Sequence, residues 1–91
     1  MIKLKIASPE QTLFDGETSQ VTIKTIDGVI TVLPNHIPLV SIIEDGYVQV
    51  PDNEIINVKK GFVTVNKNSS IDILISVLEE PQKGDEWKNL I

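Results

Sequence analysis

The chain has 91 residues, of which 41% are hydrophobic and 23% are charged, and its formal net charge is -5 at pH 7. This length suits one domain with one core, and the composition is that of a globular chain rather than a disordered one. Cysteine is absent, which excludes disulfides and the usual thiolate zinc sites. The acidic balance, with lysines that do not cluster with aromatic residues, disfavours nucleic acid as a partner.

The start of the chain does not resemble a signal peptide, because Lys3 and Lys5 interrupt the apolar residues there. No stretch approaches the roughly 18 apolar residues that a membrane span requires. We therefore expect a protein of a cytosol-like phase with no direct membrane insertion. Any link to a membrane would then run through another protein.

Apolar residues alternate with polar ones along most of the chain, which predicts β-strands. The alternation covers 2–6 and 21–24 and, less cleanly, 47–50. A last strand, 71–77, is expected to be buried on both faces, because apolar residues occupy both sets of alternate positions. Those on one face are Ile71, Ile73 and Ile75, and those on the other are Leu74 and Val77.

Short polar stretches typical of turns separate the predicted strands. They are Ser8-Pro9, Asp15-Gly16, Asp27-Gly28, Asp45-Gly46, Pro51-Asp52-Asn53 and 66–70. The pair at 27 and 28 predicts the clearest hairpin, over 25–30, because Asp-Gly accepts the positive φ values of a type I′ turn. Turns about every ten to fifteen residues indicate an all-β sandwich or barrel of short, mostly antiparallel strands.

We predict one all-β domain over residues 1–78, followed by a short tail over residues 79–91. Pro81 and Gly84 interrupt the strand pattern there. Trp87, Leu90 and Ile91 share helical spacing, which favours one or two helical turns in the tail. A frayed tail is the alternative.

Residues for catalysis are scarce. His36 is the only histidine, and the carboxylates of Asp27, Glu44 and Asp45 do not have a spacing that predicts convergence on a metal or on a substrate. The glycines are too far apart for a phosphate-binding loop or a dinucleotide fingerprint. The sequence therefore predicts no catalytic residues, no cofactor and no metal site, and His36 is expected to bond to the backbone or to meet a partner.

The most unusual segment is 32–40, in which Pro34 and Pro38 bracket Asn35 and His36. Each proline fixes its own φ and favours an extended conformation in the residue before it, so this loop is expected to be stiff. A stiff exposed loop suits binding, because little conformational entropy is lost on docking. A rigid crossover between strands, without a partner, is the alternative.

This segment, read as Leu-Pro-Asn-His-Ile-Pro-Leu over 33–39 after Asp27-Gly28, resembles a signature of the epsilon subunit of F-type ATP synthases. Other pieces resemble that family in the same order. They are 8–10 with 13–17, Val21, Gly46, and 60–65 with 71–74. The resemblance runs from about Ile2 to Ser76 and implies the family's amino-terminal domain, a flattened β-sandwich of about ten strands.

In that family this domain lies at the foot of the rotating central stalk, where it binds the gamma subunit and rests on the membrane-embedded ring of c subunits. The resemblance implies a non-catalytic rotor subunit that couples proton translocation to ATP synthesis. It implies a peripheral position on the cytoplasmic face of the bacterial inner membrane, or on the equivalent stromal or matrix face.

The resemblance also implies two sets of contact residues. Gamma contacts are expected at Ser8, Pro38, Leu39, Val40 and Ser41, and contacts with the ring of c subunits at Asn35 and His36. Val29 stands where some relatives carry a carboxylate that faces the ring, so a charge-based contact there is not expected.

Typical bacterial and chloroplast relatives continue into a carboxy-terminal helical hairpin, which restrains ATP hydrolysis and in some cases binds ATP. This sequence stops before such a hairpin, so we expect neither self-inhibition nor ATP binding. Two other functions stay open. One is a free-standing β-sandwich module for a small ligand or carbohydrate, although its only aromatic residues, Phe14, Tyr47, Phe62 and Trp87, are expected mostly in the core. The other is a small enzyme that uses His36.

Overall fold

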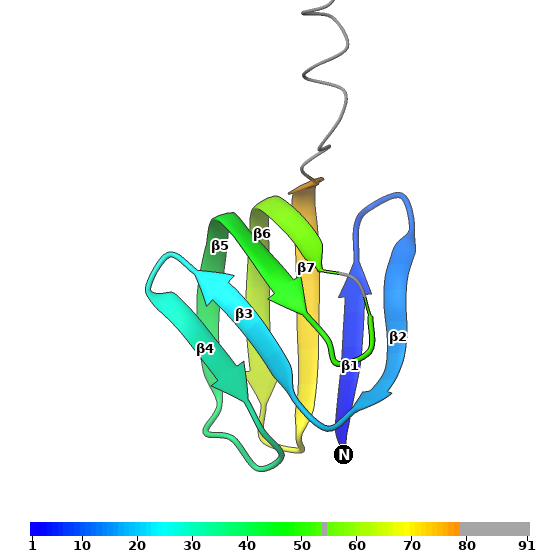
Figure 1. Cartoon of the computed structure of the whole chain (residues 1–91), viewed down its shortest axis with the longest axis vertical. Coiled ribbons are helices and arrows are strands. Elements are labelled where there is room, and N and C mark those ends of the chain that lie inside the picture. The colour runs from blue at the N-terminus through cyan, green and yellow to red at the C-terminus, as the bar shows by residue number, and fades with distance from the viewer. Residues whose placement is uncertain (54, 79–91) are drawn as a thin grey trace, which may run out of the picture.

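The computed structural model describes residues 1–53 and 55–78, and these residues form an all-β structure (Figure 1). The strands are β1 (Ile2–Ala7), β2 (Thr12–Thr18), β3 (Val21–Thr25), β4 (Gly28–Val32), β5 (Leu39–Gln49), β6 (Ile56–Asn66) and β7 (Ser70–Leu78). The all-β prediction is confirmed. No membrane-spanning helix occurs within the described residues. The helical turns predicted for residues 79–91 lie outside them.

All seven strands belong to one sheet, in the order β2-β1-β7-β6-β5-β3-β4. Neighbouring strands are antiparallel except for β1 and β7, which run parallel from Lys3 opposite Ser70 to Ala7 opposite Leu74. The strand from the start of the chain therefore lies in the interior of the sheet, beside the last strand.

The sheet becomes a sandwich because its two longest strands, β5 and β6, bend over the top and run through both layers (Figure 1). The back layer consists of β2, β1 and β7 together with residues 61–66 of β6 and 39–44 of β5. The front layer is β4 and β3 with residues 46–49 of β5 and 56–58 of β6. Counted by layer, these seven strands provide nine segments, close to the roughly ten strands that the resemblance implies.

The bends lie where a turn was expected at Asp45-Gly46, and that prediction is wrong because β5 continues through it. Asp45 has a φ of 47°, and neither it nor Lys59, which lies opposite it, pairs in the β5–β6 ladder, although the register is the same on both sides of this point. The strand therefore turns the corner at the positive φ of Asp45 without an extra residue. Gly46 then passes against β3, where a Cβ atom would lie 2.1 Å from the Lys24 carbonyl oxygen. The register of β6 against β7 shifts between Val58 and Gly61.

Asp15-Gly16 is not a turn either. Gly16 lies within β2 and pairs with Leu4 of β1, so strand pairing outweighs the local turn preference. The other expected turns are present. Between β1 and β2, the Ser8 backbone N–H donates to the Gln11 carbonyl at 2.8 Å.

The hairpin at 25–30 is confirmed, but its turn is not type I′. Thr25 pairs with Gly28, and the positive φ falls on Gly28, at 115°, and not on Asp27. The Thr25 hydroxyl donates to the Gly28 carbonyl at 3.0 Å and accepts the Asp27 backbone N–H at 3.1 Å. The turn also contacts the other layer. The Ile26 backbone N–H donates to the Ile42 carbonyl at 2.9 Å, which joins the tip of the β3–β4 hairpin to β5 in the back layer.

The core lies between the layers and consists almost entirely of isoleucine and valine from alternate strand positions. Ile71, Ile73 and Ile75 point into it and are fully buried or nearly so. Leu74 and Val77, on the other face of β7, are 51% and 44% exposed, so the prediction that both faces of this strand are buried is wrong. The front layer covers only the inner face, and nothing in the described residues covers the outer one.

The bend makes Gly46 a sensitive position. We expect Gly46→Ala to lower the free energy of unfolding by about 1–3 kcal/mol, because the added methyl group meets a backbone carbonyl that cannot move without disturbing the β3–β5 ladder. Thermal and chemical unfolding of both proteins measure this.

The matched control is Gly16→Ala. Its Cβ would lie 3.6 Å from the Phe14 ring, an ordinary contact, so its effect on stability is expected to be smaller. Equal destabilisation by the two substitutions would show that the contact at the bend is not the cause.

Candidate partner-binding surfaces

The outer face of the back layer carries a cluster of exposed apolar side chains. Strand register places Ile42 opposite Phe62, and Phe62 opposite Leu74. About half of the Phe62 side chain is exposed, and Val40, two residues before Ile42 on the same face, is 75% exposed. We call Val40, Ile42, Phe62 and Leu74 the apolar patch. A cluster of this kind on one face of a small domain marks a surface that another molecule covers.

Phe62 stands between two shallow grooves. One, of about 290 Å³, runs from Phe62 and Leu74 toward Ala7 and Lys5. The other, of about 180 Å³, lies between Phe62, Ile42 and Gly61. A half-exposed aromatic ring with a groove on either side can anchor an interface, because side chains of a partner can fill both grooves around it.

Charged residues border the apolar patch on β1, β2 and β7. Lys5 faces Asp15 on one side and Asp72 on the other, and Lys3 faces Glu17. These side chains line a depression of about 410 Å³ that shares Lys5 and Asp72 with the first groove. An apolar centre with a charged margin is the usual anatomy of a protein–protein interface.

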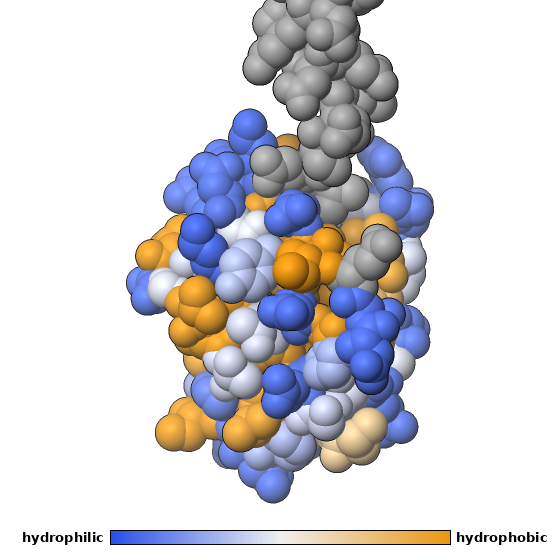
Figure 2. Space-filling view, viewed as in Figure 1, coloured by the Kyte–Doolittle hydropathy of each residue, from blue (hydrophilic) through white to orange (hydrophobic). Residues whose placement is uncertain are grey.

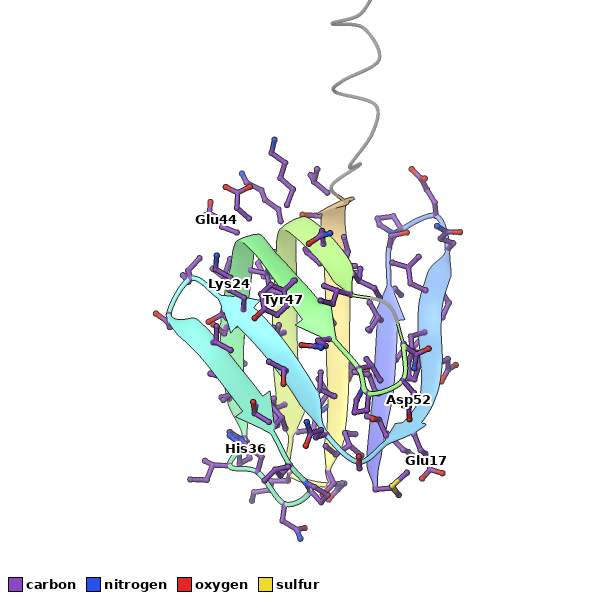
Figure 3. All side chains as sticks on the ribbon, viewed as in Figure 1. Glu17, Lys24, His36, Glu44, Tyr47 and Asp52 are labelled. Atoms are coloured by element: carbon purple, nitrogen blue, oxygen red, sulfur yellow. The ribbon has the colours of Figure 1, made fainter. Side chains whose placement is uncertain are left out.

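The outer face of the front layer is more polar than the outer face of the back layer, and polar side chains interrupt its apolar surface. The hydroxyls of Thr22 and Thr31 lie 3.2 Å apart, and Lys24 pairs with Tyr47. Figure 2 views this face and shows polar side chains interleaved with apolar ones, and Figure 3 places Lys24 beside Tyr47. The two outer faces of the sandwich are therefore not equivalent.

A second candidate surface is the loop between β4 and β5, at the lower end of the sandwich (Figure 3). The His36 backbone N–H donates to the Leu33 carbonyl at 3.2 Å, which closes a turn around Pro34 and Asn35. The His36 Nδ1 lies 2.7 Å from the Ile37 carbonyl oxygen, so the predicted bond of this histidine to the backbone is confirmed. With Nδ1 as the donor, Nε2 is left to accept a hydrogen bond from outside.

Apolar side chains accompany the polar pair of this loop. Ile37 is 78% exposed and Leu33 is about half exposed. Asn35 has a φ of 67° and is held by Ser69 of the β6–β7 turn. The loop thus offers an amide, an imidazole and two apolar side chains in a conformation that hydrogen bonds maintain.

The residues for which the sequence predicts gamma contacts occupy two separate places. Pro38 ends the loop, and the next three residues begin β5, with Val40 facing outward. Leu39 packs against the core instead, and the half-buried Ser41 donates to an Asp27 carboxylate oxygen at 3.3 Å. Ser8 lies in the β1–β2 turn, separated from β5 by β7 and β6.

Phe62 and Leu74 lie between those two places on the same face, and sequence reasoning missed them as surface residues. Phe62 was expected mostly in the core. The signal that could have found them is that apolar residues occupy both parities of 60–65 and 71–75, so that one set has to face outward unless a third layer is present.

The structure brings no second catalytic group to His36 by any hydrogen bond among the described residues. Within the same residues, no group of three or more His, Cys, Asp or Glu side chains is placed to hold a metal ion. What these surfaces can do chemically is bind other molecules.

Comparison with known proteins gives one consistent family. The β-sandwich domain of the ATP synthase delta/epsilon chain matches residues 1–81. The ATP synthase epsilon chain of Leptospira interrogans is 34% identical, over 98% of this chain and 74% of its own length. The ATP synthase epsilon chain of Frankia casuarinae is also 34% identical, over 90% of this chain and 95% of its own length.

Solved structures share the fold. A chain in the cryo-EM structure of the central stalk and c-ring of the Tetrahymena thermophila mitochondrial ATP synthase has a TM-score of 0.74 at 15% identity, over 92% of this chain and 69% of that one. A chain of the Euglena gracilis mitochondrial ATP synthase gives 0.71 at 22% identity, over 96% and 57%. The family resemblance noted in the sequence is confirmed: this chain belongs to the ATP synthase delta/epsilon chain family.

Proposed function

We propose that this protein is a non-catalytic rotor subunit of an ATP synthase, which binds the gamma subunit through the apolar patch and the c-ring through the β4–β5 loop. The observation that carries the proposal is the row of Ile42, Phe62 and Leu74, exposed side by side on adjacent strands. A subunit that couples two rotating parts needs two separate contact surfaces on one stiff body.

The apolar patch supports binding to gamma. Its side chains remain in contact with water in the isolated domain, and each Å² of apolar surface removed from water contributes roughly 25 cal/mol. Val40 extends the patch to the first residues of β5, where the resemblance implies gamma contacts. On the other side, Ala7 pairs with Leu74 and leads to Ser8, so one partner surface can reach both predicted places.

The β4–β5 loop supports binding to the ring. It lies at an end of the sandwich, and its backbone is held by the bonds of His36 and Asn35. Asn35 can donate and accept, and the free Nε2 of His36 can accept, which suits the polar loops and backbone groups of a partner. The Tetrahymena structure in which the same fold occurs contains the central stalk and the c-ring, which is the setting that we propose here.

In this setting the work of the protein is mechanical. A sandwich whose layers share two continuous strands resists shear between its faces, because sliding would break the β5–β6 ladder. Torque entering at the loop therefore reaches the apolar patch through a single sheet. The protein would be peripheral to the membrane, on the cytoplasmic face in a bacterium or on the equivalent stromal or matrix face, and would need no cofactor.

A ligand-binding module is less well supported. The depression next to Lys3 and Lys5 has no aromatic residue in its described lining, whereas carbohydrate sites rely on aromatic stacking. Phe62 is exposed, but its neighbours on the sheet are aliphatic, as is typical of a protein interface.

Replacing Phe62 tests the gamma surface. We expect Phe62→Glu to weaken gamma binding by roughly 30-fold or more, because the interface loses an anchor worth about 2 kcal/mol and would bury a charge. Titration calorimetry and co-elution with the gamma subunit from the same source measure the affinity. The melting temperature should change little, since the side chain is half exposed.

The matched control is Val29→Glu, which places the same charge at an exposed apolar position on β4 of the front layer. It should bind gamma normally. If Phe62→Glu kept full affinity, or if both variants lost it equally, the outer face of the back layer would not be the gamma surface.

Replacing His36 tests the loop. His36→Ala should weaken binding of the complex with gamma to detergent-solubilised c-ring by about 2-fold to 10-fold, the usual contribution of one hydrogen bond, and leave gamma affinity unchanged. His36→Gln, which retains an acceptor, should restore part of the binding. Unchanged ring binding by His36→Ala would remove this side chain from the contact.

A further inference from the structure

The loop between β4 and β5 does not stand alone at the lower end of the sandwich. The backbone N–H of Asn35 donates to the Ser69 hydroxyl at 2.9 Å, and that hydroxyl lies 3.4 Å from the Asn35 side-chain oxygen, to which it donates. Ser69 belongs to the turn between β6 and β7. Its own carbonyl accepts the Lys3 backbone N–H at 3.0 Å, so the turn is also fixed to β1.

Both residues of this contact have left-handed backbones. The φ angle is 67° at Asn35 and 54° at Ser69. Such a conformation is disfavoured for a residue with a Cβ atom, less for asparagine than for serine. It persists where surrounding bonds hold it, and the paired bonds between these two residues supply that restraint.

The turn exposes side chains beside those of the loop. Lys67 and Asn68 are exposed and stand just before Ser69, so the contact places them next to Asn35 and His36. Figure 1 shows the two connections at the same end of the molecule as the N-terminus. The combined surface has amides, an imidazole and a cation, with Leu33 and Ile37 exposed around them.

We propose that the β6–β7 turn is the second half of the ring-binding surface, and that Ser69 is the positioning residue that joins it to the β4–β5 loop. This rests on the function proposed above. The partner chemistry is that of polar loops presenting backbone carbonyls and carboxylates, which Lys67, Asn68 and Asn35 bind as donors.

Joining the two loops in advance favours binding because the surface is already ordered before the ring arrives. Each side chain that docking would otherwise have to immobilise reduces the affinity, because its conformational entropy is lost on binding. Ser69 contributes through Asn35 and does not need to touch the ring itself. Its loss should therefore affect ring binding while gamma binding, on another face, is unchanged.

Ser69→Gly removes the hydroxymethyl group and with it both bonds to Asn35, while glycine accepts the positive φ without strain. In the full chain, hydrogen exchange of the Asn35 backbone amide should accelerate several-fold. Binding of the complex with gamma to the c-ring should weaken by about 5-fold to 10-fold. The melting temperature and gamma affinity should match those of the wild type.

The control for Ser69 is Ser70→Ala, which removes the adjacent hydroxyl, an acceptor for the Asn66 side chain that makes no bond to the loop. It should leave ring binding intact. A second variant, Lys67→Gln, tests the turn without touching the contact. It should weaken ring binding, whereas Lys59→Gln, at an exposed position of β6 opposite Asp45, should not.

The outcomes separate this inference from the function on which it rests. If the wild-type complex does not bind the c-ring, the proposed function fails. If the wild type binds and Ser69→Gly binds equally well, Ser69 is not a positioning residue. Unchanged Asn35 exchange, or a fall in melting temperature with parallel loss of gamma binding, overturns the role of Ser69 as well. Normal ring binding by Lys67→Gln overturns the place of the turn in the surface.

Discussion

The structure depends on one close approach, that of Gly46 to the Lys24 carbonyl at the bend of β5. There the backbone of one strand touches the backbone of its neighbour with no room for a side chain. The approach lets a single sheet fold over itself, so that front and back layers share β5 and β6 instead of meeting only through side chains. Core, faces and end loops all take their positions from that bend. A residue without a Cβ atom at this point therefore allows the approach without strain.

Folding one sheet over itself also decides which surfaces are available to partners. The inner faces of both layers are used up by the core, which leaves two outer faces and two ends. Of these, the back face carries Ile42, Phe62 and Leu74 in a row, and the lower end carries the loop around His36. They are at an angle to each other, so two large partners can be bound at once without competing. The arrangement suits a part that transmits force between neighbours.

The fold class could be predicted from the sequence because alternation of apolar residues reports directly on strands with one buried face. The limits of the individual strands could not be predicted in this way. Asp15-Gly16 and Asp45-Gly46 have the composition of turns, yet Gly16 pairs with Leu4 of β1 and Gly46 pairs with Val58 of β6, which keeps both pairs of residues within strands. Such long-range pairing has no local signal. The candidate surfaces could be predicted only in part, because their outward-facing residues depend on long-range packing as well. The stiff loop at 33–38 could be read from its prolines, whereas Phe62 and Leu74 resemble core residues until the number of layers is known.

The parallel pairing of β1 with β7 has a consequence for how the protein is made. Residues 3–7 can pair only after residues 70–74 have been made. The long stretch of chain between them must therefore be closed into a loop before the back layer and the core are complete. A topology of this kind folds on the scale of milliseconds to seconds and not microseconds. On the ribosome, residues 3–7 are synthesised well before residues 70–74, so β1 lacks this neighbour until β7 has been made. Until the core closes, its apolar face of Ile2, Leu4 and Ile6 stays exposed, and a chaperone can bind it there.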